Sequence, residues 1–384
     1  MIVPYARQSI SDDDISAVVA VLRSDYLTQG PVVEQFENDV ADYCGAAFGV
    51  AMNSATSALH VACLALDLGP GDILWTSAIT FVASANCALY CGASVDFVDI
   101  DIDNHNISVP ALEEKFRAAE RRNCLPSVLV VVHFSGEPAD LKPIKAMADK
   151  YGCRLIEDAS HAIGAQYHGT AIGACQHSDI TVFSFHPVKI LTTGEGGMAM
   201  TNDPKLADRL RLLRSHGITR DPAEMVHPFE GSWYYEQVEL GYNYRLTDIG
   251  AALGCSQLRR IETFIARRHD LARRYDQALE GLLVTRPCRS AASRSALHLY
   301  VIRIDPDQHD RKVIFDRLRA SGIMVNVHYI PVYRQPFYAS LGHPFESCPS
   351  AETYYQSAIT LPMYADLTHF EQDTVVDALR KALG

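Results

Sequence analysis

Short apolar runs alternate with longer amphipathic segments between residues 48 and 215 of the chain. The apolar runs have the length and composition of buried strands, and we expect strands at 48–52, 72–76, 94–98, 127–134, 154–158, 180–183 and 198–201. Apolar residues at helical spacing predict helices at 33–44, 59–66, 109–121, 140–151 and 204–215. This alternation predicts an α/β fold with a mostly parallel central sheet.

The chain after residue 215 has a different pattern. An irregular aromatic loop at 221–239 is interpreted as a packing or interface loop. We then expect a long helix at 247–280, a strand at 297–304, a helix at 310–319, a strand at 324–329, and helices near 351–357 and 370–383. These elements predict a smaller C-terminal α+β domain. We place the large domain at residues 1–255 and the small domain at residues 256–384.

Polar residues follow three of the expected strands. Asn53 and Ser54 come after the strand at 48–52, Asp158 ends the strand at 154–158, and Lys189 lies on a turn just past 180–183. In open α/β sheets, ligands bind outside the carboxyl ends of the strands. We therefore expect these residues to meet at one edge of the sheet and to form a site there.

Lys189 could act as a nucleophile, and Ser54 could help to bind a phosphate. An amine at the end of a buried strand is partly removed from water, and desolvation favours its neutral, nucleophilic form. The alternative is an ordinary exposed loop lysine. Ser54 opens a run of small residues before an expected helix, and such a helix start can hold a phosphate. The alternative there is an ordinary N-cap.

An amine, a phosphate-binding helix start and a strand-end carboxylate together match the needs of pyridoxal phosphate. The amine of Lys189 would bind the cofactor aldehyde, and the carboxylate of Asp158 would keep the pyridine nitrogen protonated. The helix start at Ser54 would hold the phosphate. Once freed, the amine would move a proton between carbons as a general acid and base. The residues therefore predict a pyridoxal-phosphate enzyme.

The composition narrows the possible partners. The 384 residues have a formal net charge of −12, which argues against nucleic-acid binding because that requires a basic face. No signal peptide, membrane-spanning run or paired metal-binding spacing of the ten cysteines is apparent. We therefore expect a cytoplasmic protein with free thiols. The acidic stretch 99–103 lacks the spacing of a calcium loop, and no metal site is expected.

Six segments resemble the DegT/DnrJ/EryC1/StrS family of sugar-nucleotide aminotransferases, which are fold-type I pyridoxal-phosphate enzymes. They are 27–30 (LTQG), 53–59 (NSATSAL), 80–86 (TFVASAN), 157–162 (EDASHA), 184–197 (SFHPVKILTTGEGG) and 241–246 (GYNYRL). The resemblance covers almost the whole chain. It implies a large cofactor-binding domain, a smaller C-terminal domain and a homodimer with shared active sites.

The resemblance also implies a role for each matched position. Lys189 would carry the cofactor, Asp158 would pair with its pyridine nitrogen, and His161 would lie near its ring oxygen, which makes these three the catalytic residues. The alternative for His161, as for His186, is a buried histidine with ordinary hydrogen bonds. The implied cofactor-binding residues are Ser54, Ala55, Phe81, Asp158, His161, Ser184, Lys189 and, from the partner subunit, Asn243.

Within the family, the segments 184–197 and 326–333 look most like the pseudaminic-acid branch. Enzymes of that branch transfer an amino group from glutamate to C4 of a UDP-linked 4-keto-6-deoxy-N-acetylhexosamine, the L-arabino-4-ulose, and give UDP-4-amino-4,6-dideoxy-N-acetyl-β-L-altrosamine. Ile190 departs from the branch, in which proline commonly follows the lysine. The implied substrate contacts are Tyr5, Asp25, Tyr26, Leu27, Thr28, Ser54, Asn243, Asn326, Val327, His328 and Tyr329.

Three alternatives to this substrate and reaction stay open. An aminotransferase for another UDP- or dTDP-linked ketosugar would have the same motifs. A sugar dehydratase of the family would carry histidine at the lysine position, and Lys189 argues against it. A non-catalytic cofactor-binding regulator would need a DNA-binding or signalling module, and no such module is apparent in this acidic chain.

Overall fold

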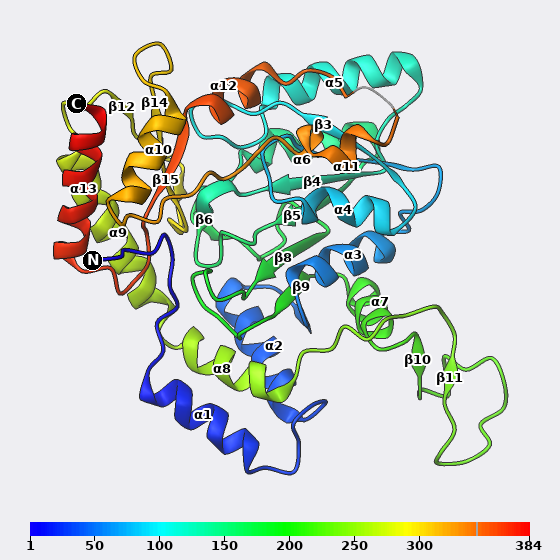
Figure 1. Ribbon diagram of the computed structural model, residues 1–384. Helices are drawn as coiled ribbons and strands as arrows, with labels where there is room; N and C mark the ends of the chain where they lie inside the picture. Colours follow the sequence, from blue (N-terminus) through cyan, green and yellow to red (C-terminus); the bar gives the residue numbers. More distant parts are fainter. Residues whose placement is uncertain (343–344) are drawn as a thin grey trace.

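The computed structural model describes residues 1–342 and 345–384. Its centre is a seven-stranded sheet with the strand order β1-β9-β8-β5-β4-β2-β3 (Figure 1). β9 is antiparallel to both of its neighbours, and the other six strands share one direction. The strands are β1 (Phe48–Met52), β2 (Ile73–Ser77), β3 (Ser94–Val98), β4 (Val128–Val132), β5 (Arg154–Asp158), β8 (Ile180–Ser184) and β9 (Gly197–Thr201). The expected α/β fold with a mostly parallel sheet is confirmed.

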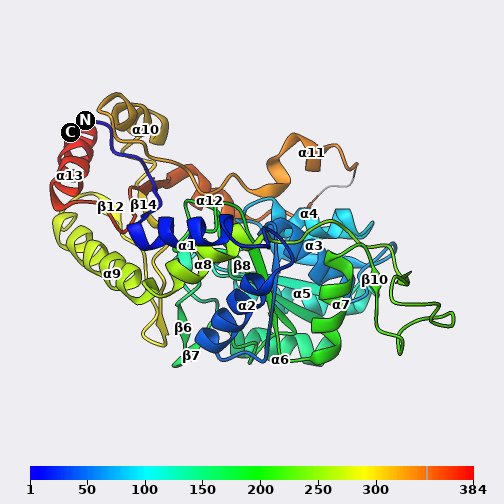
Figure 2. The same ribbon diagram turned by 90° about the horizontal axis from the view of Figure 1, so that it is seen from below.

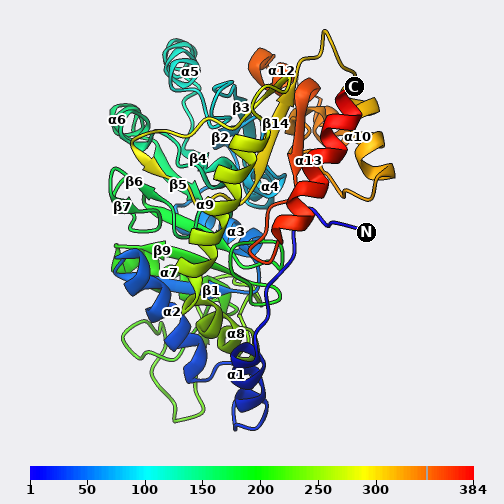
Figure 3. The same cartoon turned by 90° about the vertical axis from the view of Figure 1, so that its left-hand side faces the viewer.

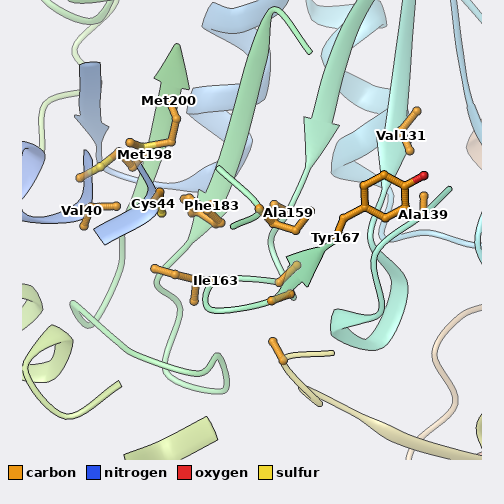
Figure 4. Packing of buried hydrophobic residues seen from close by; sticks show 14 of the residues in the cluster. Val40, Cys44, Val131, Ala139, Ala159, Ile163, Tyr167, Phe183, Met198 and Met200 are labelled. Carbon is orange, nitrogen blue, oxygen red and sulfur yellow. The ribbon is translucent and has the colours of Figure 1, made fainter. Parts of the chain in front are cut away.

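Helices cover both faces of this sheet, so its strands are apolar on both sides. Along β4, Leu129 and Val131 belong to one hydrophobic cluster, whereas Val128 and Val130 belong to another on the opposite face. Figure 4 shows part of the first cluster, where Phe183 lies close to Met198 and Met200. The helices of the first cluster are α2 (Pro31–Cys44), α5 (Val109–Arg122), α6 (Leu141–Tyr151) and α8 (Asp248–Leu258), and those of the second are α3 (Ala55–Ala65), α4 (Ala83–Tyr90), α7 (Pro204–Arg214) and α12 (Pro349–Ser357).

The C-terminal part has its own hydrophobic cluster around a small antiparallel sheet. Figures 2 and 3 show its helices gathered at one end of the molecule, with both chain termini beside them. The N-terminal arm joins this part because Val3 pairs with the chain at Ile323. The elements are β12 (Val284–Thr285), β14 (Tyr300–Ile304), β15 (Ala358–Leu361), α9 (Ile261–Ala278), α10 (Arg311–Ala320) and α13 (His369–Leu383). The division into residues 1–255 and 256–384 stays a prediction.

Two expected elements differ from the structure. The helix expected at 247–280 is two helices, α8 and α9, separated at Arg259 and Arg260. The side chain of Arg260 reaches back to Asp14 of helix α1 (Asp12–Leu22), which helps to fix the break. The strand expected at 324–329 is wrong, because the segment makes a single bridge between Asn326 and Thr360.

The segment 324–329 meets β15 at one residue only. Asn326 exchanges both of its backbone hydrogen bonds with Thr360. In an antiparallel pair the amide of the next residue, Val327, points away from that strand. The side-chain oxygen of Asn326 accepts a 2.8 Å hydrogen bond from this amide and so satisfies it.

The aromatic loop expected at 221–239 is a projecting hairpin. Its base is formed by β10 (Ile218–Thr219) and β11 (Glu236–Gln237), and Figures 1 and 2 show it reaching away from the rest of the chain. Trp233 is 71 % exposed, and Val226 and Phe229 near the tip are also exposed. Within the described residues, no helix is both long enough and apolar enough to cross a membrane.

Candidate active site

A cavity of about 770 Å³ opens at the carboxyl ends of the central strands. Its volume lies in the range of sites for small molecules. Asn53 after β1, Asp158 at the end of β5 and Lys189 after β8 all line it, which confirms that these three strand-end features meet. The topology explains the meeting, because the three strands point in the same direction and end at the same edge.

Lys189 lies on the turn that follows β8, where its amide donates a 2.9 Å hydrogen bond to the carbonyl of His186. The amide of Phe185 bonds the carbonyl of Gly196, so the loop that carries the lysine is closed at its base. Desolvation in the cavity wall lowers the pKa of the Lys189 amine to about 8, and the Asp158 carboxylate opposes this shift. Neutral amine is therefore available near physiological pH, as nucleophilic chemistry requires.

Asp158 is buried at the end of β5, and three donors hold its carboxylate. The amide and hydroxyl of Ser160 donate to Oδ1 at 3.1 and 2.6 Å. The hydroxyl of Ser84 donates to Oδ2 at 2.6 Å. A carboxylate that accepts several hydrogen bonds is fixed in direction. Asp158 can thus present a negative charge to a cationic ligand atom.

The start of α3 forms a concave wall that can receive an anion. Ser54 is the N-cap of this helix, and its hydroxyl accepts a 3.1 Å bond from the amide of Ser57. Gly197 of β9 backs onto the same helix start, where a Cβ would lie 2.4 Å from the amide nitrogen of Ala55. The first amides of a helix have no acceptor within it and point outward with the positive end of the helix dipole. Ser184 lies in the same cavity wall.

His161 lies behind this wall instead of lining it. Its Nε2 is 3.2 Å from the hydroxyl of Tyr329, and its ring centroid is 4.5 Å from that of His298. Burial lowers the pKa of both imidazoles well below the ordinary value, with Lys189 adding to the effect, so both are neutral. Tyr329 and His298 line the cavity and stand between it and His161.

The expected substrate residues fall into two groups. Tyr5, Asn326, Val327, His328 and Tyr329 line the cavity together with Phe81, whose side chain is 56 % exposed. The segment 25–28 does not line it, and neither does Asn243. Thr28 instead pairs with Thr247 before α8, so the segments 25–28 and 326–329 do not line one cavity within a single chain.

The sequence interpretation missed three residues of this site. Ser84, Ser160 and His298 hold or face the key side chains, but they were not assigned a role. Ser84 and Ser160 lie in the motifs 80–86 and 157–162. Their hydrogen bonds to Asp158 become visible only in the folded structure. His298 precedes a strand of the C-terminal part, and its sequence context gives no sign of the cavity.

The donors of the cavity wall fit pyridoxal phosphate. Lys189 supplies an amine for the aldehyde, Asp158 a carboxylate for the pyridine nitrogen, and the α3 start a place for the phosphate. Gly197 lets β9 pack directly against the backbone of Ser54 and Ala55, which line the cavity. Phe81 offers an exposed aromatic face for the ring.

Comparisons with known proteins agree with this chemistry. A relative from Campylobacter jejuni, named UDP-4-amino-4,6-dideoxy-N-acetyl-beta-L-altrosamine transaminase, is 35% identical over 386 residues, or 99% of this chain and 98% of the relative. The spore coat polysaccharide biosynthesis protein SpsC of Bacillus subtilis is 37% identical over 98% of this chain and 96% of its own length.

Solved structures and a family model complete the comparison. Helicobacter pylori PseC, an aminotransferase involved in the biosynthesis of pseudoaminic acid, has a TM-score of 0.91 and 30% identity, with 100% of this chain and 99% of that chain covered. The putative sugar aminotransferase Spr1654 of Streptococcus pneumoniae in its PLP form has a TM-score of 0.90 and 28% identity, covering 100% and 99% of the two chains. The model of the DegT/DnrJ/EryC1/StrS aminotransferase family matches residues 8–380. The chain therefore belongs to the DegT/DnrJ/EryC1/StrS aminotransferase family and is a pyridoxal-phosphate-dependent sugar aminotransferase.

Proposed function

We propose that this enzyme transfers an amino group from glutamate to C4 of a UDP-linked 4-keto-6-deoxy-N-acetylhexosamine, the L-arabino-4-ulose. The product is UDP-4-amino-4,6-dideoxy-N-acetyl-β-L-altrosamine, an intermediate for pseudaminic acid. The observation that carries the proposal is the meeting of Lys189 and Asp158 in one cavity, in a chain 35–36% identical to two Campylobacter jejuni transaminases with this product in their name.

Bound pyridoxal phosphate supplies a ring that accepts electrons from a substrate carbon and stores the amino group between two half-reactions. Asp158 would pair with the pyridine nitrogen, because its carboxylate is already fixed by Ser84 and Ser160. The helix start at Ser54 and Ala55 would hold the phosphate. Phe81, which lines the cavity, would offer an aromatic face to the ring.

Lys189 moves the proton. Its Nζ has a pKa of about 8, so near neutral pH it can take a proton from a substrate carbon and return it to another. The imidazoles of His161 and His298 are neutral and add no positive charge next to this amine. The amine therefore remains basic enough to act as the general base.

The opposite wall of the cavity receives the sugar. Tyr5 and the segment 326–329 come from the N-terminal arm and the C-terminal part, which are joined by the pairing of Val3 with Ile323. Both amino donor and ketosugar must react at the same place in turn, so the kinetics are ping-pong.

A homodimer with shared sites forms part of the proposal. Asn243 and the segment 25–28 are exposed and lie outside the cavity of their own chain, so they are free to face the cavity of a second copy. The projecting hairpin at 220–235 exposes Val226, Phe229 and Trp233, and large exposed apolar side chains of this kind mark interaction surfaces. A cytoplasmic location is also proposed, which agrees with ten cysteines that are all free.

The test is a comparison of substrates. Purified enzyme with pyridoxal phosphate and glutamate is offered the L-arabino ketosugar and its D-xylo epimer at equal concentration, and the amino sugar is measured by mass. Clear preference for the L-arabino epimer supports the proposal. Preference for the D-xylo epimer or for a dTDP sugar would overturn the substrate and leave the aminotransferase in place.

Another UDP- or dTDP-linked ketosugar is the second candidate. The observation in its favour is the equally extensive likeness to the Bacillus subtilis spore coat protein, whose name gives a polysaccharide of the spore coat and no particular sugar. Ile190, where proline commonly follows the lysine, agrees with such a difference. A non-catalytic regulator is no longer needed as an explanation, because the chain is an aminotransferase.

A further inference from the structure

Two buried hydroxyls form a chain that ends on the Asp158 carboxylate. The Oγ of Ser84 lies 2.6 Å from Oδ2 of Asp158, and the Oγ1 of Thr80 lies 2.7 Å from the Oγ of Ser84. Ser84 is 0 % exposed and Thr80 is 2 % exposed. Solvent therefore cannot compete for these hydroxyls. In each hydrogen bond of the chain, one oxygen is the donor and the other is the acceptor.

The charge of the carboxylate sets this direction. An ionised carboxylate only accepts hydrogen bonds, so Ser84 must donate its single hydroxyl proton to Asp158. The oxygen of Ser84 is then left as an acceptor, and Thr80 donates to it. The order Thr80 to Ser84 to Asp158 places the positive ends of both O–H dipoles toward the negative charge. The order can reverse only if Asp158 itself takes up a proton.

A role in helix capping does not account for these hydroxyls. Thr80 and Ser84 lie at the start of α4, where threonine and serine often bond free backbone amides. The N-cap of α4 is Val82, and no side chain caps the helix there. Instead, the amide of Ser84 donates to the carbonyl of Phe81, its hydroxyl donates to Asp158 of β5, and the hydroxyl of Thr80 bonds that of Ser84. The fold uses them for Asp158.

We propose that Thr80 and Ser84 are positioning residues that fix the direction of the Asp158 carboxylate. The inference rests on the proposed role of Asp158 as partner of the pyridine nitrogen. Because Phe81 lies between the two hydroxyl residues and lines the cavity, one short segment sets both the ring-facing aromatic side chain and the carboxylate at the ring edge. A change in the segment 80–84 would therefore affect both Phe81 and Asp158.

The test compares variants that remove or keep one hydroxyl. Ser84→Ala and Thr80→Val break the chain, Thr80→Ser keeps it, and Thr76→Val is the matched control. Thr76 is 0 % exposed and its hydroxyl donates to the carbonyl of Val130 at 3.0 Å, with no link to Asp158. Each apo-protein is titrated with pyridoxal phosphate, and the visible absorption of the loaded protein is followed against pH.

Ser84→Ala is expected to bind pyridoxal phosphate roughly tenfold more weakly, because a carboxylate that has lost one of its three donors is no longer held in direction toward the pyridine nitrogen. The pH at which its visible absorption changes should be higher than in the parent protein. A poorly held Asp158 keeps less positive charge on the pyridine ring, and the nitrogen of Lys189 that carries the cofactor then keeps its own proton to a higher pH. Thr80→Val should shift both quantities in the same direction by less, while Thr80→Ser and Thr76→Val should match the parent.

Asp158→Asn separates the two ways in which the test can fail. If Asp158→Asn leaves affinity and absorption unchanged, the role of Asp158 is wrong, and this inference falls with it. If Asp158→Asn changes both quantities but Ser84→Ala behaves like Thr76→Val, the positioning inference is overturned and the role of Asp158 stands. Should Ser84→Ala not fold, the difference between Thr80→Val and Thr80→Ser decides the question.

Discussion

Gly197 lies so close to Ala55 that a Cβ on the glycine would be 2.4 Å from the Ala55 amide nitrogen. The neighbouring contacts, at 2.5 and 2.6 Å, are also backbone atoms, which cannot turn aside as a flexible side chain could. β9 is therefore packed directly onto the start of α3. A side chain at 197 would displace the backbone of Ser54 and Ala55, and both residues line the cavity.

Gly197→Ala is expected to displace the start of α3 and to weaken binding of pyridoxal phosphate, with a loss of stability of about 1–3 kcal/mol from overpacking. Cofactor titration and thermal unfolding of the apo-protein measure the two effects. Gly69→Ala is the control, because a Cβ there meets nothing within 4 Å. Equal cofactor affinity in the two variants would contradict the role of this contact.

Lys189→Ala should abolish turnover while the protein still folds, because the lysine lies on a loop and its amine makes no hydrogen bond in the described part of the chain. Borohydride treatment of the loaded parent enzyme should leave the cofactor attached to a peptide that contains Lys189. Mass spectrometry of the digest identifies that peptide. Attachment to any other lysine would refute the assignment.

Cofactor uptake by the apo-enzyme should depend on pH with a midpoint near 8. The neutral amine is the nucleophile, and burial lowers the pKa of Lys189 to about 8, so uptake should be slow below this pH and reach a plateau above it. Stopped-flow absorption at several pH values measures the rate. Asp158→Asn removes the carboxylate that opposes the shift, so its midpoint should lie lower. A midpoint near the ordinary lysine value of about 10.4 would disagree.

Mixed dimers test the shared site. Lys189→Ala and Asn243→Ala should each be nearly inactive, but mixing the unfolded chains and refolding them together should restore part of the activity. One site of each mixed dimer would then receive both an intact lysine and an intact asparagine. Activity of the mixture is compared with that of each variant refolded alone. A stable, fully active monomer would argue against this arrangement.

The fold and the centre of the site were predictable for a common reason. Buried parallel strands leave continuous apolar runs, and the polar residue after each run falls at the same edge of the sheet. Asn53, Asp158 and Lys189 could therefore be brought together before any coordinates. The apolar runs and the polar residues that follow them were sufficient for this prediction, because parallel strands all end at the same edge of the sheet.

The remaining parts depend on contacts that the local sequence does not encode. Ser84 reaches Asp158 across 74 positions of the chain, and His298 enters the cavity wall from the C-terminal part. The segment 324–329 has the apolar content of a strand, but it pairs with β15 only where Asn326 meets Thr360. The break between α8 and α9 similarly depends on the distant Asp14.

The pairing of Val3 with Ile323 has a consequence for how the protein forms during synthesis. The arm that contains Tyr5 leaves the ribosome first, but its partner segment emerges only after most of the chain has been made. Contacts between such distant segments form late, because the loop between them must close first. The sheet and the loop of Lys189 can therefore assemble before the wall at Tyr5 is in place, so the last part of the cavity to form is the side that faces the sugar.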